Sequence, residues 1–196
     1  MSGFTNPTTS VSTFALQNPR GTGTQNLGAS LDSAEATTGT QAITSSAVHF
    51  ASVVLTAGTV VGTLNWATGA TSSVGSTNAW LGLFDANLNL VAVTADFNTA
   101  LLAAGANQIM NVAIANVAGG AATSYTVPST GIYYVGFCVT GATLPTTTHA
   151  NVNAVITATA PRRSGRATGQ ATPPTFPYQL GTVTNVAYIP YLYATA

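Results

Sequence analysis

The chain has 196 residues, and charged residues make up only 4% of them, against roughly 25% in an average soluble domain. Lysine is absent and the formal net charge is zero, so the charge balance points to neither a nucleic acid nor an anionic membrane surface. The length suits one domain, and the apolar runs are broken too often by Thr, Gly, Asn or Ser to form a membrane-spanning helix.

So neutral a surface allows two interpretations. Either Thr, Ser, Asn and Gln solvate it, or other subunits cover much of it; we favour the second, because neutral surfaces lack the repulsion that keeps copies apart. The N-terminal "MSGFTNPTTSVSTF" lacks the basic and apolar regions of a signal peptide, so we expect synthesis in a cytosol. The single cysteine, Cys138, cannot form an internal disulfide and is expected in the core.

Residues 1–45 are polar and almost uncharged, and such a segment cannot bury enough apolar surface to fold alone. We expect an extended docking arm, held either across its own domain or on a neighbouring subunit. Within it, "LDSAEA" (31–36) predicts one helical turn capped by Asp32, with Glu35 three residues on.

From residue 46 the pattern becomes that of a β-protein. Residues 97–107 predict a short helix or a long crossover, and Pro190 places its strand at an edge or a bulge. Residues 161–185 form a Pro/Gly/Thr loop long enough to be functional or a docking segment. Strands are predicted at 48–56, 59–68, 79–85, 88–96, 108–117, 131–140, 151–160 and 186–194. The fold class is therefore all-β, an antiparallel β-sandwich over 46–196, most simply a jelly roll.

Few residues of the chain have side chains that could take part in catalysis or bind a metal. His49 lies in a predicted strand and is expected to be half-buried there, whereas His149 lies in a Thr-rich stretch and is expected to be an exposed loop residue. No catalytic, redox or phosphate-binding motif accompanies them. In "DANLN", Asp85 with Asn87 and Asn89 offers calcium ligands, but we favour Asp85 as an acceptor of backbone hydrogen bonds in the turn. We therefore expect no enzyme activity, no cofactor and no metal.

Two groups are candidates for an interface. The arginines of "RRSGR" suit subunit docking or a solvated loop, with nucleic acid as the weakest alternative. The aromatic residues interleaved with prolines near the C-terminus suit the core, a subunit contact or a glycan-stacking surface. The candidate residues are Arg162, Arg163, Arg166, Phe176, Tyr178, Tyr188, Tyr191 and Tyr193.

Three stretches carry a resemblance: "NAWLGLFDANLNLVAVTAD", "SYTVPSTGIYYVGFCVTGATLPT" and the Pro-rich "PRRSGRATGQATPPTFPYQLG". They resemble a family of small structural proteins of bacteriophages that infect actinobacteria, in which a "WLGLYD" hairpin precedes a "YTVP" strand pair. The resemblance covers roughly residues 48–181. Its members are generally called minor tail proteins, and similar β-sandwiches occur as tail-fibre domains and capsid decorations. This chain departs in its turn, where "DANLN" replaces a Gly-containing one, and in its 45-residue arm.

The resemblance implies a non-enzymatic virion structural protein on the particle exterior, tail-associated and assembled through its arm and sandwich. The alternatives are a capsid decoration (cement) protein and a receptor- or glycan-binding module. The expected partners are other copies of the chain, as a homotrimer by resemblance, other virion proteins and a host-surface glycan, with no nucleic acid and no membrane insertion. Deletion of residues 1–40 is predicted to leave a folded sandwich that no longer joins particles.

Overall fold

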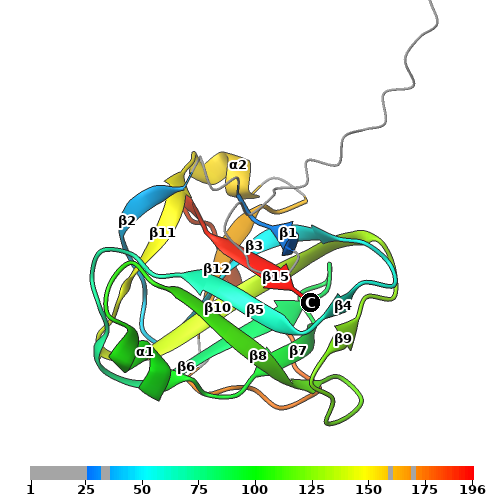
Figure 1. Ribbon diagram of the computed structural model, residues 1–196. Coiled ribbons are helices and arrows are strands. Elements are labelled where there is room, and N and C mark those ends of the chain that lie inside the picture. The colour runs from blue at the N-terminus through cyan, green and yellow to red at the C-terminus, as the bar shows by residue number, and fades with distance from the viewer. Residues whose placement is uncertain (1–25, 32–35, 159–160, 169–170) are drawn as a thin grey trace, which may run out of the picture.

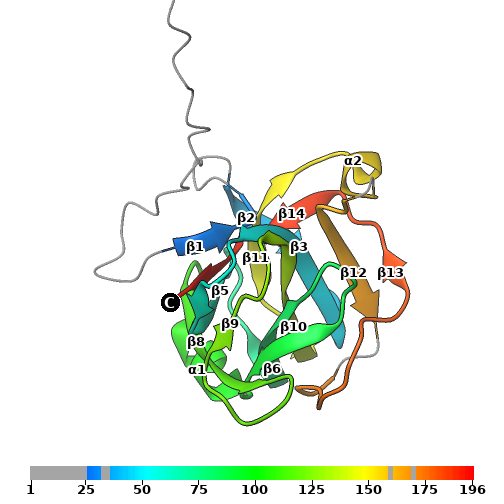
Figure 2. The ribbon, with the colours of Figure 1, turned by 90° about the vertical axis from the view of Figure 1, so that its right-hand side faces the viewer.

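The computed structural model describes residues 26–31, 36–158, 161–168 and 171–196 (Figures 1 and 2). No helix in these ranges is long and apolar enough to cross a membrane. In chain order the elements are β1 (Asn26–Ala29), β2 (Thr37–Ala42), β3 (Ala47–Leu55), β4 (Val60–Val61), β5 (Thr63–Ala67), β6 (Val74–Phe84), β7 (Leu90–Thr94), α1 (Asn98–Ala104), β8 (Ile109–Val117), β9 (Tyr125–Thr126), β10 (Gly131–Thr143), β11 (Thr146–Asn151), α2 (Ala154–Ala158), β12 (Ser164–Thr168), β13 (Val183–Thr184), β14 (Tyr188–Pro190) and β15 (Leu192–Thr195).

The all-β antiparallel sandwich predicted from the sequence is confirmed. A continuous sheet runs in the order β1-β15-β5-β8-β7-β6-β10-β3-β12-β13. The sheet folds back on itself between β8 and β7. As a result, the half with β15, β5 and β8 lies across the main core from the half with β6, β10 and β3 (Figure 2). Trp66 of β5 stacks on Phe137 of β10 with ring centroids 4.2 Å apart, which joins the two halves through a buried aromatic contact.

A second apolar cluster covers the outer face of one half of the sheet. Alternation along β3 sends Val53 to the main core and Phe50 to this outer cluster. The segment between β12 and β13 supplies its cover through Phe176, Tyr178 and Leu180. The strands in this half of the sheet therefore have apolar side chains buried on both faces, which explains their continuous apolar runs.

Two smaller sheets complete the fold. The order β14-β11-β2 places β14 at an edge, and β14 ends at Pro190, so the prediction that this proline marks an edge strand is confirmed. The other sheet is the short ribbon β4-β9. The predicted short helix within 97–107 is also present, as α1.

The prediction of a strand at 151–160 is wrong. The strand lies earlier, as β11, and is followed by the one-turn helix α2. Asn153 explains the switch, because its Oδ1 accepts a hydrogen bond from the N–H of Val155 and so satisfies a donor at the helix start.

The prediction that 161–185 is one long loop, functional or docking, is wrong as to its structure, because β12 and β13 lie within it. β12 pairs with β3 across the whole of its length. Gly165 permits this packing: a Cβ there would lie 2.7 Å from the Phe50 ring and 2.7 Å from a methyl group of Val183. A side chain at this position would push the outer cluster away from the sheet.

The described part of the predicted arm lies on its own domain, one of the two alternatives that the sequence leaves open. Asn26–Ala29 pairs with β15 and Thr37–Ala42 pairs with β11, so both segments belong to the body of the sandwich. A deletion of residues 1–40 would therefore remove β1 and most of β2 rather than an arm alone. Residues 1–25, with the rest of the docking prediction, and the capped turn at 32–35 lie outside the described residues.

Gly136 and Gly82 lie opposite each other on β10 and β6, and the Phe84 ring lies against both. A Cβ at Gly136 would lie 2.9 Å from Val48 Cγ1 and 3.2 Å from Phe84 Cε2. We predict that Gly136→Val lowers the free energy of unfolding by about 1–3 kcal/mol through overpacking, measured by urea denaturation.

Gly131→Ala is the matched control on the same strand, because a Cβ there meets nothing within 4 Å. It should stay within about 0.5 kcal/mol of the parent chain. Equal urea midpoints for Gly136→Val and the parent would show that the outer cluster is not closely packed here.

Candidate functional site

Both histidines are buried in the described structure, and they approach the same tyrosine. His49 hydrogen-bonds to the hydroxyl group of Tyr188 through Nδ1, and its Nε2 accepts a hydrogen bond from the backbone N–H of Thr44 at 3.0 Å. Since Nε2 is an acceptor, the neutral ring carries its proton on Nδ1 and donates it to the Tyr188 oxygen. The His149 ring meets the Tyr188 ring edge-on, with centroids 6.0 Å apart.

The expectation of an exposed loop position for His149 is wrong. It lies on β11 and is only 6% exposed. The Thr-rich stretch pairs with β2 on one side and β14 on the other, since β-branched threonines suit a half-buried strand. His49 lies in a strand as expected, but it is fully buried rather than half-buried.

The environment of His49 keeps it neutral. Burial, and to a smaller extent the nearby Arg166 guanidinium, lower the pKa of His49 to about 3. The ring also stacks on Phe137, with centroids 5.3 Å apart. A neutral, stacked, hydrogen-bonded imidazole is a structural element of the core rather than a proton donor at neutral pH.

The carboxylates of the described residues hold turns. Asp85 Oδ1 accepts hydrogen bonds from the backbone N–H groups of Asn87 and Asn89, at 2.8 and 2.9 Å, which confirms the predicted turn role. Asp85 Oδ2 accepts a third from the Asn89 side-chain amide. These bonds hold Leu88 at a φ of 64°, a conformation that favours glycine. The described ranges contain no cluster of three or more side chains that would hold a metal.

The three arginines take different positions. Arg166 is on β12 rather than in a loop, directly opposite His49, and its Nη1 donates to Thr44 Oγ1 at 2.7 Å. Arg162 donates to the side chain of Asn185. Arg163 is the exposed member of the three and the best placed to meet a neighbour. Their predicted docking role stays a prediction.

The aromatic candidates divide into two sets. Tyr188, Tyr191 and Tyr193 are at most 8% exposed, so they pack in the core, one of the three roles that the sequence leaves open for them. Phe176 and Tyr178 are half-buried and line a surface hollow of about 670 Å³.

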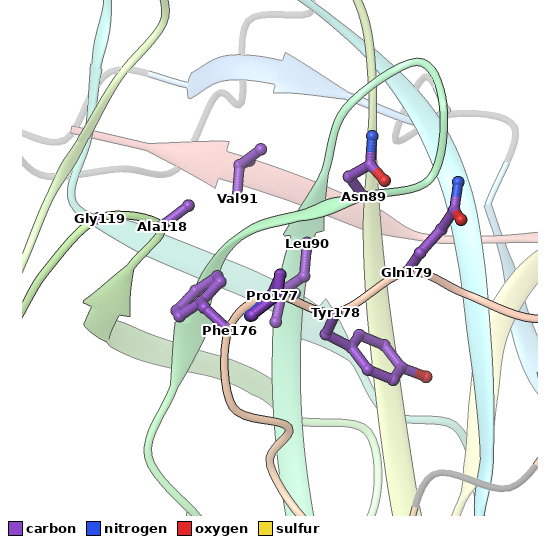
Figure 3. Close-up of a pocket in the computed structure, with 9 residues that line it drawn as sticks. All are labelled: Asn89, Leu90, Val91, Ala118, Gly119, Phe176, Pro177, Tyr178 and Gln179. Carbon is purple, nitrogen blue, oxygen red and sulfur yellow. The ribbon is translucent and has the colours of Figure 1, made fainter.

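Three segments far apart in the sequence form this hollow: the start of β7, the turn after β8 and the segment before β13. Leu90 donates its N–H to the Tyr178 carbonyl at 2.8 Å, and Leu180 donates to the Leu88 carbonyl at 3.0 Å. Figure 3 shows Phe176 and Pro177 on one side of the hollow, and the hydroxyl group of Tyr178 pointing away from them. The lining residues are Asn89, Leu90, Val91, Ala118, Gly119, Phe176, Pro177, Tyr178 and Gln179.

A second hollow, of about 410 Å³, adjoins the first at Val91. Asp85 and Asn87 line one wall, and Tyr125 and Tyr133 line another, with ring centroids 6.4 Å apart. Sequence reasoning missed this hollow because Tyr125 lies outside every predicted strand and Tyr133 counts only as a residue of the strand predicted at 131–140. The available signal is the turn "VPSTG", which has a tyrosine close to each end.

No protein-family model, curated protein or solved structure matches this chain. Its function therefore has to be inferred from its own residues.

The buried neutral His49 predicts a stability that falls in acid. The unfolded chain binds a proton at its imidazole below pH 6.5, whereas the folded chain resists that proton until about pH 3. The stabilisation is fully present above pH 6.5 and is lost as the pH falls. At about 1.4 kcal/mol per pH unit, we expect His49 to contribute a loss of about 2 kcal/mol between pH 6.5 and 4.5.

His49→Gln should remove this contribution while retaining a polar group beside Thr44 and Tyr188. Urea denaturation of the parent and the variant across this pH range measures the difference. Parallel pH profiles for the two proteins would contradict the assignment.

Proposed function

We propose that this chain is a non-enzymatic structural protein of a bacteriophage particle, on the particle exterior and associated with the tail. It assembles there with copies of itself and with other virion proteins. The observation that best supports the proposal is a nearly uncharged surface that also exposes aliphatic side chains. Val54 of β3 is 64% exposed, Val74 of β6 63% and Ile109 of β8 55%.

A surface of this kind suits permanent contact with neighbours. A charge buried in an interface without a partner costs several kcal/mol, whereas buried apolar area contributes about 25 cal/mol per Å². The exposed aliphatic residues lie on strands from several parts of the sheet and on α1, where Leu102 is also exposed. Several neighbours around each copy would cover them, as in a symmetric assembly.

Several ionisable groups of the described residues support a structural role, because they serve the fold. Asp96 Oδ1 accepts hydrogen bonds from the backbone N–H groups of Ala79 and Asn98. Cys138 is buried, and burial raises the pKa of its thiol to about 12, so it is not a nucleophile at neutral pH. Together with the neutral His49, these groups stabilise turns and packing.

The resemblance to actinobacteriophage proteins supports the phage assignment. Its first stretch, 78–96, forms the β6–β7 hairpin, and its second, 124–146, includes β9 and β10. These are framework strands of the sandwich, so the resemblance is one of architecture. A capsid decoration protein is the second candidate, since it needs the same neutral contact surface; particles that lose stability in its absence would favour it.

Lysine substitutions at exposed aliphatic positions test the assembly role. Val54→Lys, Val74→Lys and Ile109→Lys should each leave the free energy of unfolding within about 0.5 kcal/mol, because these side chains are solvent-exposed in the isolated chain. At least one should fail to join particles when it replaces the parent protein during infection, because its ammonium group would be desolvated in the interface.

Threonine at the same positions is the matched control, since it is close to valine in shape and carries no charge. The threonine variants should join particles normally, as measured by the amount of protein that purifies with them. Full incorporation of all three lysine variants would contradict the proposal.

A further inference from the structure

We propose that the groove made by the two hollows on either side of Val91 binds a neutral oligosaccharide. The inference goes beyond the assembly role and stands on the geometry of the groove. The hollows, of about 670 and 410 Å³, flank the Asp85–Asn89 turn and share Val91. Each hollow has a volume within the size range of small-molecule sites, with room for a sugar ring.

The groove has flat apolar surfaces in both halves. Phe176 and Pro177 line the larger hollow, and Tyr125 and Tyr133 line the smaller one. Aromatic rings bury the C–H face of a ligand, while a tyrosine hydroxyl group tolerates water at its edge. A pyranose ring presents such a C–H face together with hydroxyl groups around its rim.

The polar lining complements those hydroxyl groups. Amide and hydroxyl side chains both donate and accept hydrogen bonds, as sugar hydroxyl groups do. The polar side chains of the groove, other than those of its tyrosines, are those of Asp85, Asn87, Asn89, Ser129, Thr130 and Gln179.

The turn holds several of these groups in place. Asn89 donates through Nδ2 to Asp85, and Gln179 donates through Nε2 to the Asn87 carbonyl at 2.9 Å. Their amide oxygens, Asn89 Oδ1 and Gln179 Oε1, accept no hydrogen bond from the described residues and lie on one side of the larger hollow (Figure 3). Fixed acceptors reduce the ordering cost of binding.

The lining also disfavours other ligands. It holds one carboxylate, Asp85, and no basic residue, so an anionic sugar or a phosphate would find no counter-charge. An extended peptide would need unpaired strand edges to add to a sheet. In the groove the backbones of Leu90 and Tyr178 already pair with each other.

The test begins with the purified full-length chain on an array of neutral oligosaccharides built from hexoses, pentoses and N-acetylhexosamines, with acidic oligosaccharides and peptides alongside. The strongest neutral binder is then titrated by calorimetry. We expect Asn87→Ala and Tyr125→Leu each to weaken its binding at least tenfold, because one removes an exposed amide and the other an aromatic ring from the groove.

Asn111→Ala is the matched control: it removes an exposed amide from β8, six residues before Val117, where that strand ends near the larger hollow. Its affinity should equal that of the parent. The proposal is overturned if no neutral oligosaccharide binds, if Asn87→Ala and Tyr125→Leu bind as the parent does, or if acidic oligosaccharides or peptides bind better. Particle incorporation is measured without sugar, so failure of this proposal and failure of the assembly role are separate results.

Discussion

The structure depends on satisfying buried polar groups with neutral partners. The charged residues of the described ranges are Asp85, Asp96, Arg162, Arg163 and Arg166, and none of them lies in the main core. Hydroxyl and imidazole groups therefore fasten the small sheet to the large one. Trp66 Nε1 donates to Thr147 Oγ1 at 2.9 Å, Ser164 Oγ donates to the Tyr188 carbonyl at 2.7 Å, and His49 bonds to the Tyr188 hydroxyl group. These hydrogen bonds stabilise the folded state, because a buried polar group left without a partner lowers the free energy of unfolding by about 1–3 kcal/mol.

The scarcity of charged residues also determines the chemistry of the molecular surface. The two aspartates of the described residues hold turns, so these residues include no carboxylate pair placed for acid–base chemistry. The surface presents mainly amides, hydroxyl groups and aliphatic side chains. Amides and hydroxyl groups suit contact with a sugar, and aliphatic groups suit contact with a neighbouring subunit. The proposed assembly role and the proposed saccharide groove would use different parts of one neutral surface, so the two proposals are compatible.

The long strands, the short helix α1 and the turn role of Asp85 could be predicted from the sequence, whereas the short polar strands and most of the groove could not. Residues 108–117 and 131–140 carry enough apolar, β-branched or aromatic residues to identify β8 and β10. β12 is built from "SGRAT", whose small polar residues have weak strand preference, and it becomes a strand only because β3, more than a hundred residues earlier, offers its edge. Phe176 and Tyr178 are candidates from the sequence, but the whole groove could not be predicted, because its walls come from the four segments 85–91, 118–119, 125–133 and 176–179, which meet only in the folded chain.

The central claim, that this protein is an external component of a phage particle, is tested most directly by a gold-labelled antibody against the chain on intact purified particles, viewed by negative-stain electron microscopy. Our account predicts gold on the tail of the particles. Gold distributed over the head would contradict the tail placement and identify a decoration protein. Particles that carry no gold, in a preparation whose lysate contains the protein, would contradict the structural role itself.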